Sequence, residues 1–277
     1  DAFIRWFAGW LQESDYADVQ SANDAKLEYQ KAYEVYKDQY AGYKTTLPTF
    51  VIQDLLRSAE TAELLDTIEE IKKAHADVTW PKTAELAKQG ELLFIHQNGE
   101  SPYKRDKIIK HKVKEDEIMI AFPEFVRKSH AIKTSSVSVQ GAGSADTILV
   151  EDITAIALQN LKDRMGRIMA KTIARRVAKF LASKGLEAAG DENDNVGLAV
   201  AGKLFNAASN AAEQADKRTW ITLPSEIRVG RLVLAPGQYT VTVKFKSSGG
   251  AVVQSKTFNN VEIKQGKKTI LNARTVR

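Results

Sequence analysis

The chain has 277 residues, of which 43% are apolar and 27% are charged, a composition typical of a folded globular protein. It contains no cysteine and only four histidines, which excludes disulfides, thiolate nucleophiles, iron–sulfur clusters and cysteine-ligated zinc. The 40 Lys and Arg residues exceed the 35 Asp and Glu residues by five, so a polyanionic partner is indicated only if the excess is concentrated on one surface.

Residues 1–88 are predicted to be helical and to form two hairpins. The first aromatic residues recur at spacings of three and four, which places them on one helix face. Ala25, Tyr29 and Ala32 follow the small–aromatic–small spacing of the second helix of a tetratricopeptide repeat. Two interpretations of the aromatic residues stay open, a plain helical core and a surface that binds a partner. The candidate interaction surface consists of Trp6, Phe7, Trp10, Tyr29 and Tyr33.

Two hairpins are fewer than the three or more repeats that such folds usually need to stand alone. We therefore expect residues 1–88 to be less stable alone than within the full chain. The aromatic-rich start also leads us to expect self-association or a place in a larger assembly.

Residues 89–218 are predicted to combine β-strands with a long basic helix and a helix of small residues. Four β-prone runs are bounded by turn residues, at about 91–96, 108–113, 118–122 and 136–139. His96 and His111 fall in two of these runs. We expect them to be solvated strand histidines rather than metal ligands, because the residues between them are rich in lysine and offer no acidic or histidine partners.

The long helix is expected over about 152–184, with Gly185 as its end. Apolar residues from Leu158 to Leu181 recur at helical spacing and form one face. Between Glu151 and Lys184, eight basic residues stand against three acidic ones, so this segment alone has a net charge of +5. The excess charge is therefore concentrated on one helix.

Five cations of this helix follow each other at spacings of three and four and form one stripe, which we call the basic stripe. It consists of Arg164, Arg167, Lys171, Arg175 and Lys179. One interpretation is a solvated face whose cations pair with carboxylates, beginning with Asp163 and Arg167. The other is an anionic partner such as lipid headgroups, a cell-wall polymer or an acidic protein. Nucleic acid is not expected, because no aromatic or amide side chains interleave with the stripe.

Residues 219–277 are predicted to form a small antiparallel β-sandwich, which could share a sheet with the central strands. Strands that alternate apolar and polar residues are separated by turns that contain glycine. The pattern Leu-x-Pro-Gly-x-Tyr-x-Val-x-Val over Leu234–Val243 is similar to β-sandwich modules that bind or act as spacers. The predicted fold class is therefore α+β, with segments 1–88, 89–218 and 219–277.

Three segments resemble a known family. They are Gly90–Ile95, Leu149–Ala157 and, most specifically, Glu213–Pro224. With the tetratricopeptide-like start, they resemble a family of Gram-negative envelope proteins of the outer-membrane lipoprotein type. The resemblance implies a periplasmic, outer-membrane-associated protein whose partners are other envelope proteins, and it supplies no catalytic residues. Since the chain has no cysteine to carry a lipid, we expect a targeting segment to precede Asp1, and the lipid anchor either to precede Asp1 as well or to be lost.

These observations favour a non-enzymatic scaffold or adaptor in an envelope protein assembly. The alternative is a binding module for an anionic envelope polymer or a lipid surface, with the basic stripe as its contact. Neither hypothesis requires a cofactor or a metal, and both allow contact with the membrane surface or the cell wall and the formation of a homo-oligomer.

Overall fold

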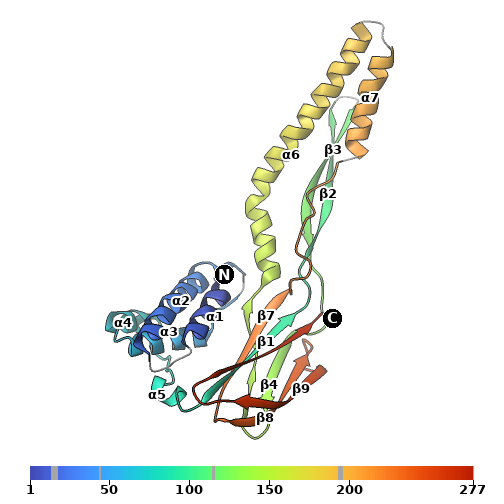
Figure 1. Ribbon diagram of the computed structural model, residues 1–277. Coiled ribbons are helices and arrows are strands. Elements are labelled where there is room, and N and C mark those ends of the chain that lie inside the picture. Colours follow the sequence, from blue (N-terminus) through green and yellow to red (C-terminus); the bar gives the residue numbers. More distant parts are fainter. Residues whose placement is uncertain (14–17, 44, 114–115, 193–195, 212, 277) are drawn as a thin grey trace. The chain divides into compact units, whose positions relative to one another are not determined.

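The computed structural model describes residues 1–13, 18–43, 45–113, 116–192, 196–211 and 213–276 (Figure 1). Within these residues, helices and three β-sheets form an α+β fold, which confirms the predicted class. The chain divides into two compact units. Unit 1 comprises Asp1–Ser101, Lys128–Ala155 and Thr222–Arg277, and unit 2 comprises Pro102–Arg127 and Ile156–Ile221.

This division differs from the three consecutive segments expected from the sequence. Unit 2 is made of two stretches inserted into unit 1, whose own parts come from the start, the middle and the end of the chain. The physical reason is that strands far apart in the sequence pair in common sheets, so no boundary falls between the central and the last segments.

Unit 1 contains two four-stranded sheets with the orders β10-β1-β7-β6 and β5-β4-β8-β9. The strands are β1 (Gly90–Asn98), β4 (Thr134–Val139), β5 (Gly143–Asp146), β6 (Ile148–Glu151), β7 (Glu226–Leu234), β8 (Gly237–Lys246), β9 (Val252–Ile263) and β10 (Lys268–Thr275). Phe94, Val137, Val243 and Phe245 belong to the core that both sheets share, and none is more than 1% exposed. The two sheets therefore pack as a sandwich around one apolar core.

The segment 219–277 does not form a sandwich of its own. Strands β7 and β10 flank β1 in one sheet, whereas β8 lies between β4 and β9 in the other. Each sheet combines strands of the central region with strands of the last region, because β7 and β10 belong to one sheet and β8 and β9 to the other. A sheet shared with the central strands was one possibility, and the structure has two such sheets.

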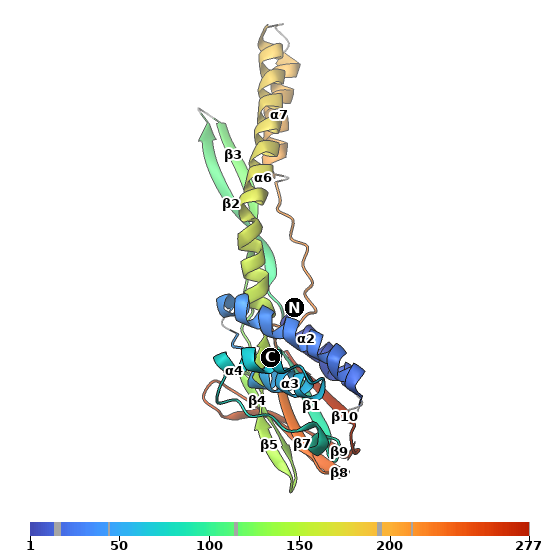
Figure 2. The same ribbon diagram turned by 90° about the vertical axis from the view of Figure 1, so that its left-hand side faces the viewer.

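The helices of unit 1 lie on the outer face of the sheet that contains β1 (Figure 2). They are α1 (Ala2–Gln12), α2 (Val19–Asp38), the 3-10 helix η1 (Tyr40–Tyr43), α3 (Thr49–Thr61), α4 (Leu65–Ala74) and α5 (Thr83–Leu86). Gly9 allows α1 to pack closely on α2, since a Cβ at this position would lie 2.9 Å from the carbonyl oxygen of Ala25 and from the ring of Tyr29. Small residues opposite an aromatic ring therefore join the first hairpin.

Buried charges connect these helices to the sheet, and we call them the buried ion network. It consists of the buried Glu13, Asp54, Arg57 and Glu91 and of the half-buried Arg231 and Lys268. Arg57 contacts Asp54 at 2.6 Å and also Glu13, while Arg231 contacts Asp54 at 2.8 Å and also Glu91. Burial alone would raise the pKa of Asp54, but Arg231 and Arg57 hold it below its ordinary value.

His96 corrects an expectation, because it is fully buried rather than solvated. Its Nε2 lies 2.8 Å from Thr275 Oγ1, and its Nδ1 lies 2.9 Å from Ser135 Oγ. Burial, with Arg228 nearby, lowers the pKa of His96 to about 4. The residue faces the inside of the sandwich, which the alternation along β1 could have indicated. The side chain of His111 lies outside what the structure describes.

Unit 2 consists of a β-hairpin and a helical hairpin. Strands β2 (Tyr103–Val113) and β3 (Asp116–Val126) pair antiparallel, and helices α6 (Ile153–Glu192) and α7 (Val196–Ala211) follow each other along the chain. Helix α6 does not end at Gly185 as expected. Its neighbours Ser183 and Glu187 pack against Gly202 of α7, where a Cβ would lie 2.7 Å from the Ser183 carbonyl oxygen. This packing outweighs the cost of about 1 kcal/mol of a glycine inside a helix.

None of the helices in the described ranges is both long enough and apolar enough to cross a membrane.

Candidate functional site

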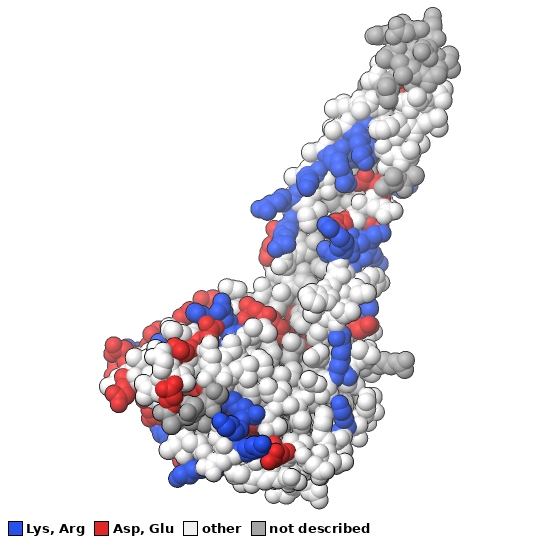
Figure 3. Space-filling view, viewed as in Figure 1, with Lys and Arg blue, Asp and Glu red and all other residues white. Residues whose placement is uncertain are grey.

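The basic stripe runs along the solvent side of α6 (Figure 3). Arg164, Arg167, Lys171 and Arg175 are exposed, and Lys179 is half-buried. Between Asp163 and Glu187 the helix contains no acidic residue. The spacing of three and four, which brings side chains onto one helix side, therefore produces a row of cations without internal compensation.

Only one cation of the stripe has an ion-pair partner among the described residues. Arg175 contacts Glu213 Oε1 at 2.7 Å, and the side chain of Glu213 is 2% exposed. The expected pair between Asp163 and Arg167 is not formed. Asp163 instead accepts a hydrogen bond from Gln159 Nε2 at 2.7 Å, one helical turn earlier. Four of the five cations of the stripe are thus left to solvent or to a partner.

Arg176 follows the stripe in sequence but has a different role. It is fully buried, and it donates hydrogen bonds to the carbonyl oxygen of Met119 at 3.2 Å, to Asn206 Oδ1 at 2.9 Å and to Asn210 Oδ1. Burial lowers its pKa, opposed by the charge of Glu213. Arg176 thus joins α6 to α7 and β3, and it fixes the direction in which the neighbouring stripe faces.

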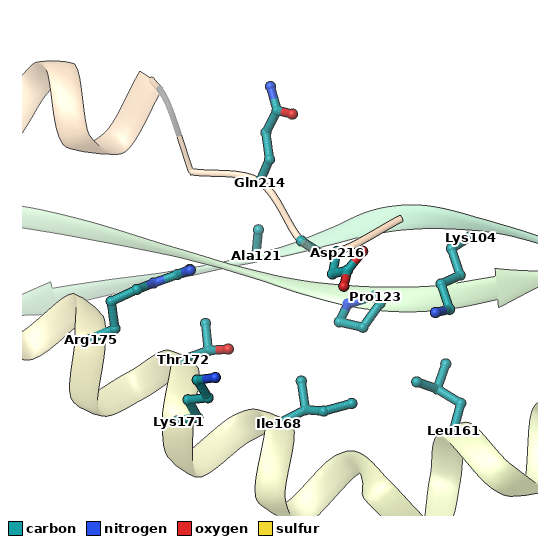
Figure 4. A pocket seen from close by; sticks show the side chains of 11 residues that line it. Lys104, Ala121, Pro123, Leu161, Ile168, Lys171, Thr172, Arg175, Gln214 and Asp216 are labelled. Atoms are coloured by element: carbon teal, nitrogen blue, oxygen red, sulfur yellow. The ribbon is translucent and has the colours of Figure 1, made fainter. Parts of the chain in front are cut away.

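A cavity of about 270 Å³ lies beside the stripe, between α6, the β-hairpin and the segment after α7 (Figure 4). Apolar side chains from α6 and β3 line one part of it, namely Leu161, Ile168, Ala121 and Pro123. Lys104, Lys171, Arg175 and Asp216 supply its charges. The cavity can accommodate an apolar group next to an anion.

The charges of this cavity are not all available to a ligand. Asp216 forms an ion pair with Arg218 at 2.9 Å, whose hydrogen bonds lower the pKa of the Asp216 carboxyl group. Lys104 Nζ donates to the carbonyl oxygen of Arg218 at 3.0 Å. Lys171 has no such contact within the described part of the chain, so it is the cation best placed to meet an anion here.

The charge of the whole sequence is concentrated in the same unit. Unit 2 contains 18 Lys and Arg against 12 Asp and Glu, a net charge of +6, whereas unit 1 contains 22 against 23, a net charge of −1. Since the stripe supplies five of these cations, it forms the centre of the positive potential of unit 2.

The prediction of an interaction surface on the first helices is wrong, because most of its residues are buried. Trp6, Trp10 and Tyr29 are fully buried, Tyr33 is 6% exposed, and Phe7 is half-buried. Trp6 Nε1 donates to Asp54 at 2.8 Å and Trp10 Nε1 to Glu91 at 3.2 Å, while the Tyr29 hydroxyl donates to Glu13 at 2.9 Å. Trp6, Trp10 and Tyr29 therefore face the buried ion network and stabilise unit 1, and they are not available to a partner. Tyr33 instead contacts His75, its hydroxyl oxygen lying 3.1 Å from His75 Nε2.

The buried ion network is not among the sites predicted from the sequence. A signal was present, because Asp54 and Arg57 stand three apart within the apolar run of α3, and Glu91 stands at the start of an apolar strand. Charges inside apolar runs indicate paired burial. Arg57 and Asp54 are inaccessible to solvent, as expected for charges that connect the helices to the sheet.

A second, more open cavity of about 530 Å³ lies in unit 1 between α2 and the end of α4. Its lining includes Tyr33, Tyr36 and His75, and Tyr33 Oη lies 3.1 Å from His75 Nε2. It lacks the concentrated charge of the stripe. No group of three or more His, Asp or Glu side chains within the described ranges is arranged to hold a metal ion.

Comparison with protein-family models, with curated proteins and with solved structures finds no match for the chain.

Proposed function

We propose that the protein is a non-enzymatic scaffold or adaptor that binds an anionic partner through the basic stripe of α6. The observation that carries the proposal is that four of the five stripe cations have no ion-pair partner among the described residues. A row of cations without counter-charges has a large electrostatic gain from meeting anions. The competing interpretation, a solvated face with internal ion pairs, is supported within the described ranges by one pair of the stripe, Arg175 with Glu213.

The periplasmic, outer-membrane-associated location belongs to the same proposal. Its support is the resemblance of Gly90–Ile95, Leu149–Ala157 and Glu213–Pro224 to an envelope protein family. In that location the anionic partners are lipid headgroups, wall polymers and acidic surfaces of other envelope proteins. The role of adaptor is supported by the division into two units. Unit 2 has the excess of positive charge, and unit 1 contains the apolar core of the β-sandwich.

The test removes charge from the stripe without disturbing the fold. The variant R164Q/R167Q/K171Q keeps helix propensity and leaves Arg175 in place, because the loss of Arg175 would leave the Glu213 carboxylate buried without a cation. Its matched control is K73Q/K88Q/K244Q, which removes three exposed cations from unit 1. Both variants lower the net charge equally, so only the position of the charge differs.

Binding is measured to poly-L-glutamate and to vesicles of phosphatidylglycerol and phosphatidylcholine at low salt. Each exposed cation near an anionic surface contributes about 1 kcal/mol, so the stripe variant should bind roughly a hundredfold more weakly, and the control should bind like the wild type. Equal losses in both variants would mean that net charge alone attracts these probes, and the proposed function would then be abandoned.

A further inference from the structure

The solvent side of α6 carries an apolar row beside the basic stripe. Met169, Ile173, Val177 and Leu181 recur every fourth residue and are 38%, 39%, 43% and 63% exposed. They extend over about 18 Å of helix. We call them the apolar ridge. A contiguous row differs from the scattered apolar residues of an ordinary surface, and contiguous exposed apolar patches are typical of interaction sites.

Small residues separate the apolar ridge from the basic stripe. Ala170, Ala174 and Ala178 are exposed and lie between the two rows around the helix axis. Three parallel rows therefore run along α6: a row of apolar side chains, a row of alanines and a row of cations. Small residues allow the axis of a second helix to approach to about 8 Å, and the larger side chains on either side then interdigitate with it.

The charges decide which helix can occupy this face. Since α6 has no acidic residue between Asp163 and Glu187, a second copy of α6 packed antiparallel would place cations against cations. A parallel second copy would cover cations with its apolar ridge. Charge complementarity therefore favours a helix with an acidic row.

We infer that the outer side of α6 binds an amphipathic helix of a partner protein, which packs an apolar row on the ridge and places an acidic row along the basic stripe. The ionic half of this inference rests on the proposed function, and the apolar half does not. The ridge and the stripe together fix the distance between the apolar and the anionic groups of a partner. A flexible polymer or a layer of headgroups does not need such a fixed distance. It is therefore the ridge that distinguishes a protein helix from other anionic partners.

The test uses two synthetic 21-residue helical peptides of identical composition. In the first peptide a leucine row lies beside a glutamate row, and in the second the same residues are scrambled around the helix. The full-length protein should bind the first peptide at least tenfold more tightly than the second. Binding is measured by fluorescence anisotropy of labelled peptide, and circular dichroism confirms that each variant is folded.

Three variants separate the two halves of the inference. I173Q/V177Q should lose the preference between the peptides while still binding poly-L-glutamate, and L27Q/L65Q, which changes two other exposed helical leucines, should retain the preference. R164Q/R167Q/K171Q should lose binding to both peptides and to poly-L-glutamate. Equal binding of both peptides by the wild type, or a preference unaffected by I173Q/V177Q, would overturn the inference while the proposed function stands. Unchanged polyglutamate binding by the stripe variant would overturn the proposed function instead.

Discussion

The buried ion network of unit 1 and the basic stripe of unit 2 give their cations opposite surroundings. In unit 1, Arg57 and Arg231 lie among Glu13, Asp54 and Glu91, and Arg57 is fully inaccessible to solvent. In unit 2, the cations of the basic stripe face solvent, and only Arg175 among them has a carboxylate partner within the described residues. Paired, buried charges contribute to holding one arrangement of helices and sheet, whereas unpaired, exposed charges contribute little to the fold and remain available for binding.

The largest expected effect comes from breaking the buried ion network. Replacing Arg57 with Met removes the cation that Glu13 and Asp54 share, and it leaves Asp54 with Arg231 alone and the buried Glu13 carboxylate without its arginine. We expect the free energy of unfolding to fall by about 3–5 kcal/mol, because removing one partner of a buried pair leaves a charge uncompensated. Urea denaturation measures the change. A loss below about 1 kcal/mol would show that the network contributes little to stability.

The next effect concerns acid stability and His96. The pKa of His96 is about 4 in the folded protein, compared with 6.5 for an unperturbed histidine. As the pH falls, the imidazole is therefore protonated in the unfolded chain before it is protonated in the folded one. The contribution of the neutral His96 is therefore complete above pH 6.5 and is lost progressively toward pH 4, by up to about 3 kcal/mol. Nuclear magnetic resonance of the imidazole gives its titration midpoint. A midpoint near 6.5 would contradict the buried, hydrogen-bonded histidine.

A smaller effect is expected where α6 and α7 touch. Valine at position 202 would drive its side chain into Ser183 and Glu187, so Gly202→Val should destabilise unit 2 by about 1–3 kcal/mol. Gly166 of α6 has open space where a Cβ would lie, and Gly166→Ala should stabilise the protein by about 0.5–1 kcal/mol. Thermal unfolding of both variants, followed by circular dichroism, compares them. If both changes had the same sign, the close approach at Gly202 would be refuted.

The sequence predicted what depends on local periodicity. The spacing of apolar residues and cations was enough to place a long helix and the basic stripe on it, and the small–aromatic–small pattern at Ala25 and Tyr29 corresponds to the close packing of α1 on α2. Aromatic residues at helical spacing are compatible with both a buried face and a binding face. Trp6 and Trp10 are buried because Asp54 and Glu91 lie beneath them.

Long-range pairing could not be predicted in the same way. Which strand flanks β1 depends on residues more than a hundred positions away, and nothing in Gly90–Ile95 specifies β10 as a parallel neighbour. Burial of His96 has the same origin, because Thr275 and Ser135 reach it from distant strands. The sequence also did not show that Asp163 and Arg167 fail to pair, since Gln159 donates a hydrogen bond to the same carboxylate.

The smallest expected effect on stability belongs to the basic stripe. R164Q/R167Q/K171Q should change the free energy of unfolding by less than about 0.5 kcal/mol, because exposed cations without partners stabilise a fold little. Arg175→Gln is the contrasting variant. It leaves the Glu213 carboxylate buried without its cation and should cost about 1–3 kcal/mol. Urea denaturation of both variants checks the difference, and a loss of several kcal/mol in the triple variant would mean that the stripe is an internal ion-pair partner.

The salt dependence of binding to poly-L-glutamate tests the central claim most directly. Affinity of the wild-type protein should fall steeply as sodium chloride rises, because salt screens exposed charges within a Debye length of about 10 Å at 0.1 M. For R164Q/R167Q/K171Q the dependence should be much flatter, whereas K73Q/K88Q/K244Q should keep the wild-type slope. Identical slopes for all three proteins would contradict the account, because the basic stripe would then contribute no more to anion binding than any other exposed cations of the chain.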